Sequence, residues 1–337
     1  MNTKRWIALV AADVLLLFSL GLNTIMAFFK ADFFSSFESA FDVTEPVTYE
    51  TPIENGDMDS RIALVSVKGT ILDVGSGSLW EEVEYNHQGF MDQLDSILHD
   101  DTVKGVILEV DSPGGGVIES AEIHEKLVQI KEQREIPIYV SMGTYAASGG
   151  YYIAAPADKI FAQKETITGS IGVIMQSYNF EKLAEKVGIE FETIKSGQHK
   201  DMFGGIRAST EEEMAMLQEI INESYEDFVD VIEQGRGMTE AQVKAVADGR
   251  ILGGTQAVRA GLVDDIGKLD DTIAALRADY GLEGAQLFEY TTTNDSFGSL
   301  LGIKVSSLFG PSQEEQLMQK ILSTSNSPRM MYLYGEY

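Results

Sequence analysis

One stretch, Ile138 to Pro156 (IYVSMGTYAASGGYYIAAP), most limits the folds that this chain can adopt. It begins with a β-branched apolar run typical of a buried strand and passes through small residues into an apolar helical turn. A strand that turns sharply into a helix at small residues forms an elbow, and a side chain there is open to a substrate. That side chain is Ser148. The stretch therefore predicts an α/β fold in which the Ser148 hydroxyl is either a nucleophile or a packing group in a glycine-rich turn.

Strands and helices alternate on both sides of this elbow. Strands are predicted over 62–67, 103–110, 157–162, 171–175 and 191–194, and helices over 89–98, over 117–133, after Thr210 and after Thr239. Alternation of this kind predicts a mainly parallel sheet with catalytic residues at the strand ends. We therefore expect one α/β domain over residues 61–290.

Three further motifs lie at the ends of predicted strands. Asp111-Ser-Pro-Gly-Gly-Gly comes directly after the strand that ends at Val110, and three consecutive glycines allow backbone N–H groups to face a carbonyl oxygen. Downstream, the segments that begin at Thr168 (TGSIGV) and at Ser196 (SGQHKD) supply a second serine and a lysine. These motifs favour the catalytic interpretation of the elbow serine.

The motifs DSPGGG, YAASGGYY, TGSIGV and KSGQHKD, in this order, resemble the signal peptide peptidase A family of membrane-anchored serine proteases, family S49. The similarity covers about residues 61–278 and is closest to the single-unit Bacillus-type members, because no second copy of the glycine motifs is present. It implies a ClpP/crotonase-like ββα spiral fold and a Ser/Lys dyad. The implied roles are nucleophile for Ser148, general base for Lys200, lysine-positioning residue for Ser170, and oxyanion hole for Gly114, Gly115 and Gly149.

The general base can also be considered from the chemistry alone. A serine hydroxyl must lose its proton as it attacks, and histidine is the commonest base. Of the four histidines, His87, His99 and His124 lie in polar or charged segments and are predicted at the surface. His199 competes with Lys200, because neighbours on an extended segment point to opposite faces. The family resemblance selects Lys200.

A lysine base must be neutral to accept a proton. Its pKa then has to fall from about 10.4 towards ~7–8, and burial in an apolar pocket can lower it. A carboxylate beside the amine would have the opposite effect. Asp201, the next residue in the chain, is therefore predicted to point away from Lys200.

The N-terminal residues have the features of a membrane anchor. Lys4 and Arg5 precede a nearly continuous apolar run to Phe29, and a helix of about 24 residues spans ~36 Å, enough to cross a bilayer. A signal-peptide cleavage site does not follow, so an uncleaved single-pass anchor over 1–30 is predicted. The basic residues place the N-terminus in the cytoplasm and the rest of the chain outside it.

Two more segments complete the predicted organisation. An acidic stretch over 31–60 is interpreted as a linker, and residues 291–337 as a C-terminal extension. The extension ends in an apolar tail, which is unusual for a free terminus in water. One hypothesis is that this tail docks as an extended segment on the same or a neighbouring subunit, near the substrate groove.

Composition excludes several classes of function. A formal net charge of -28, from 25 basic and 53 acidic residues, argues against a nucleic-acid partner. Because the chain has no cysteine, thiol catalysis, disulfides and thiolate metal sites are excluded, and its scattered histidines do not favour zinc. We expect no metal and no cofactor.

The predicted function is that of a membrane-anchored serine endopeptidase. By resemblance, it would degrade remnant signal peptides and other apolar peptides at the extracytoplasmic face of the cell membrane. The resemblance also implies a homo-oligomer, such as a ring with sites at subunit interfaces, so Lys200 of one copy could reach Ser148 of another. The alternative is a non-proteolytic crotonase-like scaffold or binding protein.

Overall fold

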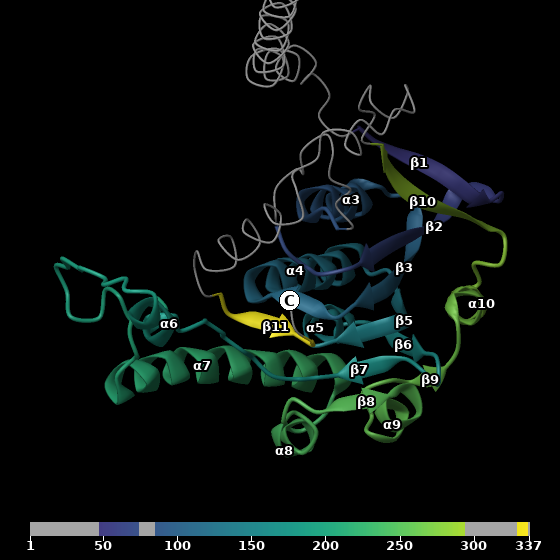
Figure 1. The fold of residues 1–337 in the computed structure, drawn as a ribbon. Helices are drawn as coiled ribbons and strands as arrows, with labels where there is room; N and C mark the ends of the chain where they lie inside the picture. Colours follow the sequence, from purple (N-terminus) through teal and green to yellow (C-terminus); the bar gives the residue numbers. More distant parts are fainter. Residues whose placement is uncertain (1–46, 74–84, 294–328, 336–337) are drawn as a thin grey trace, which may run out of the picture. The chain divides into compact units, whose positions relative to one another are not determined.

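The computed structural model describes residues 47–73, 85–293 and 329–335 (Figure 1). The chain divides into two units, and nearly all of the described residues belong to the one that contains 48–292 and 296–337. The predicted anchor over 1–30 lies outside the described residues. Within the described ranges, every helix is too short or too polar to cross a membrane.

A nine-stranded sheet forms the centre of the larger unit. Seven strands follow the order β1-β10-β2-β3-β5-β6-β9, and β7 pairs with both β5 and β8. The pairs from β10 to β9, and that of β5 with β7, are parallel, whereas β7 and β8 are antiparallel. The strands are β1 (Val47–Glu54), β2 (Asp57–Lys68), β3 (Val103–Ser112), β5 (Ile138–Ala147), β6 (Lys159–Ala162), β7 (Ile167–Gly169), β8 (Ile251–Gly253), β9 (Asp265–Ile266) and β10 (Ala285–Thr293). The predicted mainly parallel α/β sheet is confirmed.

Two apolar clusters cover opposite faces of this sheet. On β2, Ile62 and Leu64 belong to one cluster and Ala63 and Val65 to the other, because successive strand residues point to opposite faces. The first face packs against α10 (Leu269–Tyr280). The second packs against α3 (His87–His99), α4 (Val117–Arg134) and α5 (Gly149–Ala154). Burial on both faces explains why the central strands are continuously apolar.

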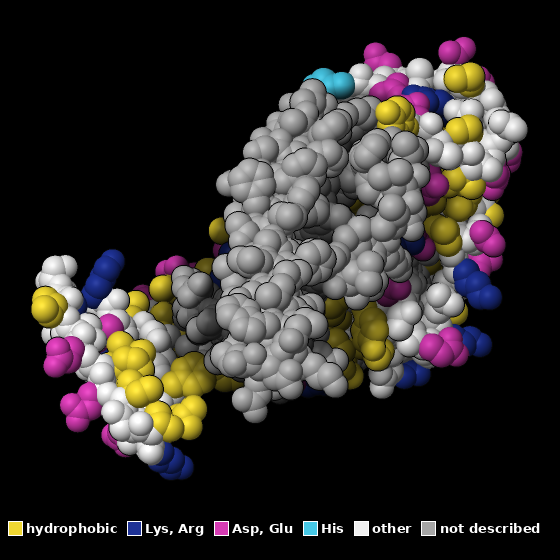
Figure 2. Space-filling model, turned by 45° about the horizontal axis from the view of Figure 1, so that its top comes forward, with side chains coloured by type: hydrophobic (Ala, Val, Ile, Leu, Met, Phe, Trp, Pro, Cys, Tyr) yellow, Lys and Arg dark blue, Asp and Glu magenta, His cyan; other side chains and the backbone are white. Residues whose placement is uncertain are grey.

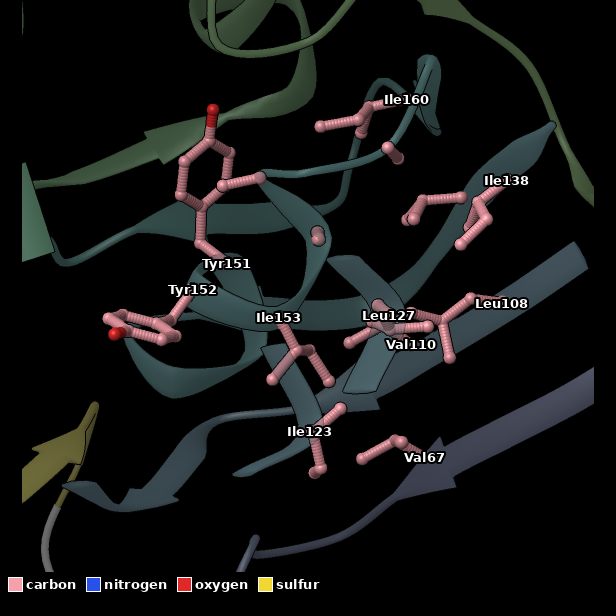
Figure 3. Packing of buried hydrophobic residues seen from close by; sticks show 14 of the residues in the cluster. Val67, Leu108, Val110, Ile123, Leu127, Ile138, Tyr151, Tyr152, Ile153 and Ile160 are labelled. Atoms are coloured by element: carbon pink, nitrogen blue, oxygen red, sulfur yellow. The ribbon is translucent and has the colours of Figure 1, made fainter. Parts of the chain in front are cut away.

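The second cluster fixes the short helix α5. In Figure 3, Ile153 of α5 lies beside Ile123 of α4, and Leu127 lies over Leu108 and Val110 of β3. All five side chains are completely buried. The start of α5 is therefore held in place by the core.

The remaining helices are α6 (Glu181–Lys186), α7 (Glu211–Arg236), α8 (Glu240–Lys244) and α9 (Gly254–Arg259). Helix α7 begins with a capping box, in which the Thr210 hydroxyl accepts from the Glu213 N–H and the Glu213 carboxylate accepts from the Thr210 N–H. Thr239 caps α8 in the same way with Gln242. Both predicted helix starts are confirmed.

Three predictions about local structure are wrong. In the segment 171–175, Ile174 makes only an isolated bridge to Met331. The segment 191–194 pairs with no strand of the described residues, and its apolar side chains are exposed, so its β-branched residues do not reflect a buried strand. Residues 47–60, predicted as the end of the linker, form β1 and the start of β2. Proline is tolerated in β1 because this strand ends the order of the sheet.

Candidate active site

The predicted elbow is present at Ser148. This residue follows the last residue of β5 and caps α5, with φ 53° and ψ −116°. A positive φ in a residue with a Cβ costs about 1–3 kcal/mol, so the surrounding structure must hold it there. The Ser148 N–H donates to the Gly169 carbonyl at 2.8 Å, and the Ser148 carbonyl accepts from the N–H groups of Tyr151 and Tyr152 at 2.9 Å. The elbow is therefore fixed from both sides.

The side chain of Ser148 is buried and unpartnered. The residue is 1% exposed, and its Oγ has no hydrogen-bond partner in the described part of the chain. Leaving a buried hydroxyl without a partner costs about 1–3 kcal/mol. This hydroxyl is thus free to bond with a group that the described residues of one chain do not supply.

The three glycines predicted for the oxyanion hole lie together beside the elbow. Strand β4 (Gly114–Gly116) passes next to the start of α5, and Gly114 has a φ of +100°. A Cβ on Gly114 would lie 2.6 Å from the Gly149 nitrogen, and a Cβ on Gly149 would lie 3.1 Å from the Gly115 nitrogen. Only residues without a side chain allow the backbone to approach this closely. Their backbone therefore lies beside the elbow, where the Gly114 N–H donates to Ser112 Oγ at 3.1 Å.

The C-terminal tail docks on this glycine strand. Strand β11 (Met331–Leu333) pairs antiparallel with β4, and Tyr332 is opposite Gly115. The carbonyl oxygen of Tyr332 lies 3.1 Å from the position of a Cβ on Gly149. The hypothesis that the tail docks as an extended segment is confirmed, and docking occurs on the same chain. An extended peptide therefore fits beside Ser148.

The Tyr332 ring occupies an aromatic pocket. It stacks on Tyr152 with the centroids 4.9 Å apart and contacts Phe228 at 4.7 Å. Its hydroxyl donates to the carbonyl of Ser224 at 2.9 Å, and the residue is 1% exposed. The pocket combines an apolar wall with a polar end, which suits an aromatic side chain.

Ser170 lies directly after β7, beside the elbow. Strand β7 pairs with β5, so that Gly169 is opposite Ala147. Ser170 has a φ of 50°, and its N–H donates to the carbonyl of Arg250 at 2.8 Å. The Arg250 side chain instead binds Asp248 at the surface. Arg250 therefore contacts Ser170 through its backbone carbonyl and not through its side chain.

Lys200 does not reach Ser148 within one chain. It lies in a turn between α6 and α7, where its N–H donates to the Gly197 carbonyl at 3.2 Å, and the residue is exposed. Figure 1 shows this segment extending with α6 away from the sheet. The described residues of one chain therefore bring together Ser148, Ser170 and the three glycines, but not Lys200.

The residue after Lys200 is held by two cations. The Asp201 Oδ1 accepts from Arg207 Nη2 and from Lys195 Nζ, both at 2.6 Å. These bonds hold the pKa of Asp201 well below its usual range, and the bond from Arg207 has the largest effect. Arg207 is a residue that the sequence patterns did not indicate, because it belongs to no motif and its partners are set by the turn.

Two histidine predictions are wrong. His87 is buried between the Tyr85 hydroxyl, 2.8 Å from Nδ1, and the Glu122 carboxylate, 2.7 Å from Nε2. His124 packs edge-on against the Tyr152 ring, and burial lowers its pKa to about 4. Contacts with Glu122 and Tyr152, which are distant in sequence, account for these positions together with the local contact of His87 with Tyr85. His99 is exposed as predicted.

Comparison with known proteins agrees with this arrangement. A family model described as peptidase family S49 matches residues 130–283. A protein of Enterococcus faecium, named as a signal peptide peptidase SppA, is 42% identical over 99% of both chains. Protease 4 of Haemophilus influenzae is 32% identical over 84% of this chain and 48% of its own length. The chloroplastic serine protease SPPA of Arabidopsis thaliana is 32% identical over 62% of this chain and 30% of its own. This chain therefore belongs to peptidase family S49 and is a serine protease.

Proposed function

We propose that this serine protease uses Ser148 as its nucleophile and Lys200 of a second copy of the chain as the general base. One observation carries the proposal: the Ser148 hydroxyl lies buried at a strained elbow and has no hydrogen-bond partner among the described residues. A nucleophilic serine needs a base within hydrogen-bond reach. Because Lys200 is exposed in a distant turn, a second copy is the natural source of that base.

The proposed reaction proceeds through an acyl-enzyme. The Ser148 oxygen attacks the peptide carbonyl carbon while its proton passes to the neutral Lys200 amine. The N–H groups of Gly149 and of Gly114 or Gly115 stabilise the negative oxygen that forms. The amine of Lys200 then returns the proton to the leaving peptide nitrogen, and water attacks the ester in a second, equivalent step. Ser170, next to the elbow, would hold the lysine amine in position.

The segment that carries Lys200 is suited to contact another copy. Figure 2 shows apolar side chains gathered on the lobe at the left, which carries α6. Exposed apolar side chains gathered in this way mark an interaction surface. Docking of this lobe on a neighbour would remove Lys200 from water, as a neutral amine requires. The exposed apolar residues of this segment are Tyr178, Leu183, Val187, Ile189, Phe191 and Ile194.

The proposed substrates are apolar peptides bound as extended strands. Pairing of β11 with β4 supports this, because a substrate can add to the glycine strand in the same way. The pocket formed with Tyr152 and Phe228 favours an apolar or aromatic side chain. Remnant signal peptides fit this description, and the Enterococcus relative is named for such substrates.

The proposal includes the predicted location and organisation. Residues 1–30 would anchor the enzyme with its N-terminus in the cytoplasm, and the protease domain over 61–290 would act at the extracytoplasmic face. The ClpP/crotonase-like ββα spiral is the proposed form of the α/β fold, and a homo-oligomeric ring is the proposed assembly. The non-proteolytic alternative is not favoured, because the chain belongs to a protease family.

Complementation between two inactive variants tests the proposal. Ser148→Ala and Lys200→Ala proteins are each expected to lack activity on a fluorogenic apolar peptide. After subunit exchange, activity should return, because Ser148 of the Lys200→Ala chain meets Lys200 of the Ser148→Ala chain. Native mass spectrometry of differently labelled chains confirms that mixed assemblies form. Mixed assemblies without activity would show that the dyad does not form between copies.

A further inference from the structure

We infer that Arg207 is a positioning residue for this protease. Arg207 holds the carboxylate of Asp201 away from Lys200, and it links the turn that contains Lys200 to the start of α7. The inference rests on the proposed function, in which Lys200 is the base. It concerns a cluster formed by Glu213 of α7 and four residues between α6 and α7: Lys195, His199, Asp201 and Arg207.

Arg207 links the turn to the helix with one guanidinium group. Its Nη2 donates to Asp201 and to Glu213, both at 2.6 Å, and its Nη1 donates to the second oxygen of Glu213 at 2.8 Å. The planar guanidinium provides donors in fixed directions, which a lysine cannot do. Asp201 lies next to Lys200, so the position of the base depends on this link.

Glu213 gives the link a rigid anchor. Its side chain is 1% exposed, and its carboxylate also accepts from the Thr210 N–H at 2.9 Å in the α7 capping box. The Nδ1 of His199 lies 3.4 Å from the same carboxylate. Arg207 lowers the pKa of Glu213 to about 2, with the Thr210 N–H as the second cause. A buried, ionised carboxylate of this kind needs its cation, so Arg207 is held in one place.

Arg207 also controls the charge beside the base. A free carboxylate next to Lys200 would stabilise the ammonium form and raise the pKa of the amine. In the structure, both cations that face Asp201, Arg207 and Lys195, bind its Oδ1. The carboxylate is thereby paired with two cations, and among the described residues Lys200 is not one of its ion-pair partners. Lys195 alone cannot fix the direction of the carboxylate, because it does not contact Glu213.

The pH dependence of kcat/KM on a fluorogenic peptide tests this role. Activity falls at acidic pH as the catalytic base becomes protonated, so the acidic limb reports the protonation of the proposed base. Arg207→Gln leaves Asp201 held by Lys195 alone and is expected to move this limb upward by roughly one to three pH units. At a pH below the limb, the rate should fall about tenfold or more. Arg277→Gln is the control. It removes an arginine of α10 that pairs with Glu54 at 2.8 Å, and it should leave the acidic limb unchanged.

A second substitution separates positioning from stability. Asp201→Asn in the Arg207→Gln background removes the carboxylate and should return the limb towards its wild-type position. A purely structural role of Arg207 would not produce this rescue. If Arg207→Gln is inactive, the double variant and Arg207→Lys decide: recovered activity in the double variant supports the inference, and no recovery in either overturns it.

The outcomes also distinguish this inference from the function on which it rests. If Lys200→Ala retains activity, the proposed function fails. If Ser148→Ala and Lys200→Ala are both inactive but Arg207→Gln leaves the acidic limb in place, the dyad stands and the role of Arg207 is wrong.

Discussion

Replacement of Gly114 by alanine probes the oxyanion site and the docked tail together. Gly114 has a φ of +100°, a conformation that alanine adopts only with strain. Its new methyl group would lie 2.6 Å from the Gly149 nitrogen and 3.0 Å from the Ala147 carbonyl oxygen, and closer still to the Tyr332 carbonyl oxygen. The nearest of these atoms belongs to β11, so β11 is the element that the methyl group displaces most directly. We therefore expect β11 to leave β4.

The expected loss of stability has two parts. Strain at the backbone costs about 1–3 kcal/mol. Exposure of the buried Tyr332 side chain costs about 1.5–3 kcal/mol more. The free energy of unfolding of Gly114→Ala should therefore fall by roughly 3–6 kcal/mol. The kcat for peptide hydrolysis should fall about 10²–10³-fold, as it does when one oxyanion donor is lost.

Urea unfolding and peptide hydrolysis measure these two effects. Gly237→Ala is the matched control, because Gly237 ends α7 with a φ of +61° and nothing lies within 4 Å of a Cβ there. It should lose about 1–2 kcal/mol and no activity. In a chain that ends at residue 327, Gly114→Ala should cost less stability, since the contact with Tyr332 is already absent.

A clear result would refute this reasoning. If Gly114→Ala is as stable and as active as Gly237→Ala, the glycine strand does not form the oxyanion site and does not hold the tail as described. If Gly114→Ala loses the same free energy of unfolding in the full-length and shortened chains, backbone strain accounts for the loss and the contact with β11 does not contribute.

Two further predictions concern the tail and a buried histidine. Deletion of residues 328–337 should raise kcat/KM for added peptides, because β11 then no longer covers β4; an unchanged rate, with unchanged assembly, would show that the tail does not compete with substrate. Burial lowers the pKa of His124 to about 4, so below pH ~6.5 the unfolded chain binds more protons than the folded one. The free energy of unfolding should therefore decrease as the pH falls from ~6.5 towards 4, and less steeply in His124→Gln; parallel pH profiles of the two proteins would contradict this.

Local sequence patterns predicted the elements that depend on interactions between residues close together in the chain. The apolar strand before Ser148 and the small residues after it are enough to predict the elbow, while distant contacts such as the bond to the Gly169 carbonyl hold it in its strained conformation. The Thr210 capping box depends on residues three positions apart, and it is present as predicted. Alternation of strands and helices likewise predicted the parallel sheet.

The parts that sequence patterns missed depend on distant partners. His124 is covered by Tyr152 of another helix, and Arg207 gains its role only when the turn brings Asp201 next to Glu213. The β-branched segment around Ile194 has a strand-like composition but lies on an exposed lobe. In the proposed mechanism Lys200 meets Ser148 only through a second copy of the chain, so this contact cannot be derived from local patterns.

The backbone at the elbow has a consequence for protein engineering. Glycine can adopt the φ of 53° at position 148 without strain, whereas serine cannot. A screen of variant libraries for heat resistance alone would therefore enrich glycine at this position and recover more stable proteins that lack the proposed nucleophile. Such libraries therefore have to be selected for catalytic turnover as well as for stability, because the two properties favour different residues at position 148.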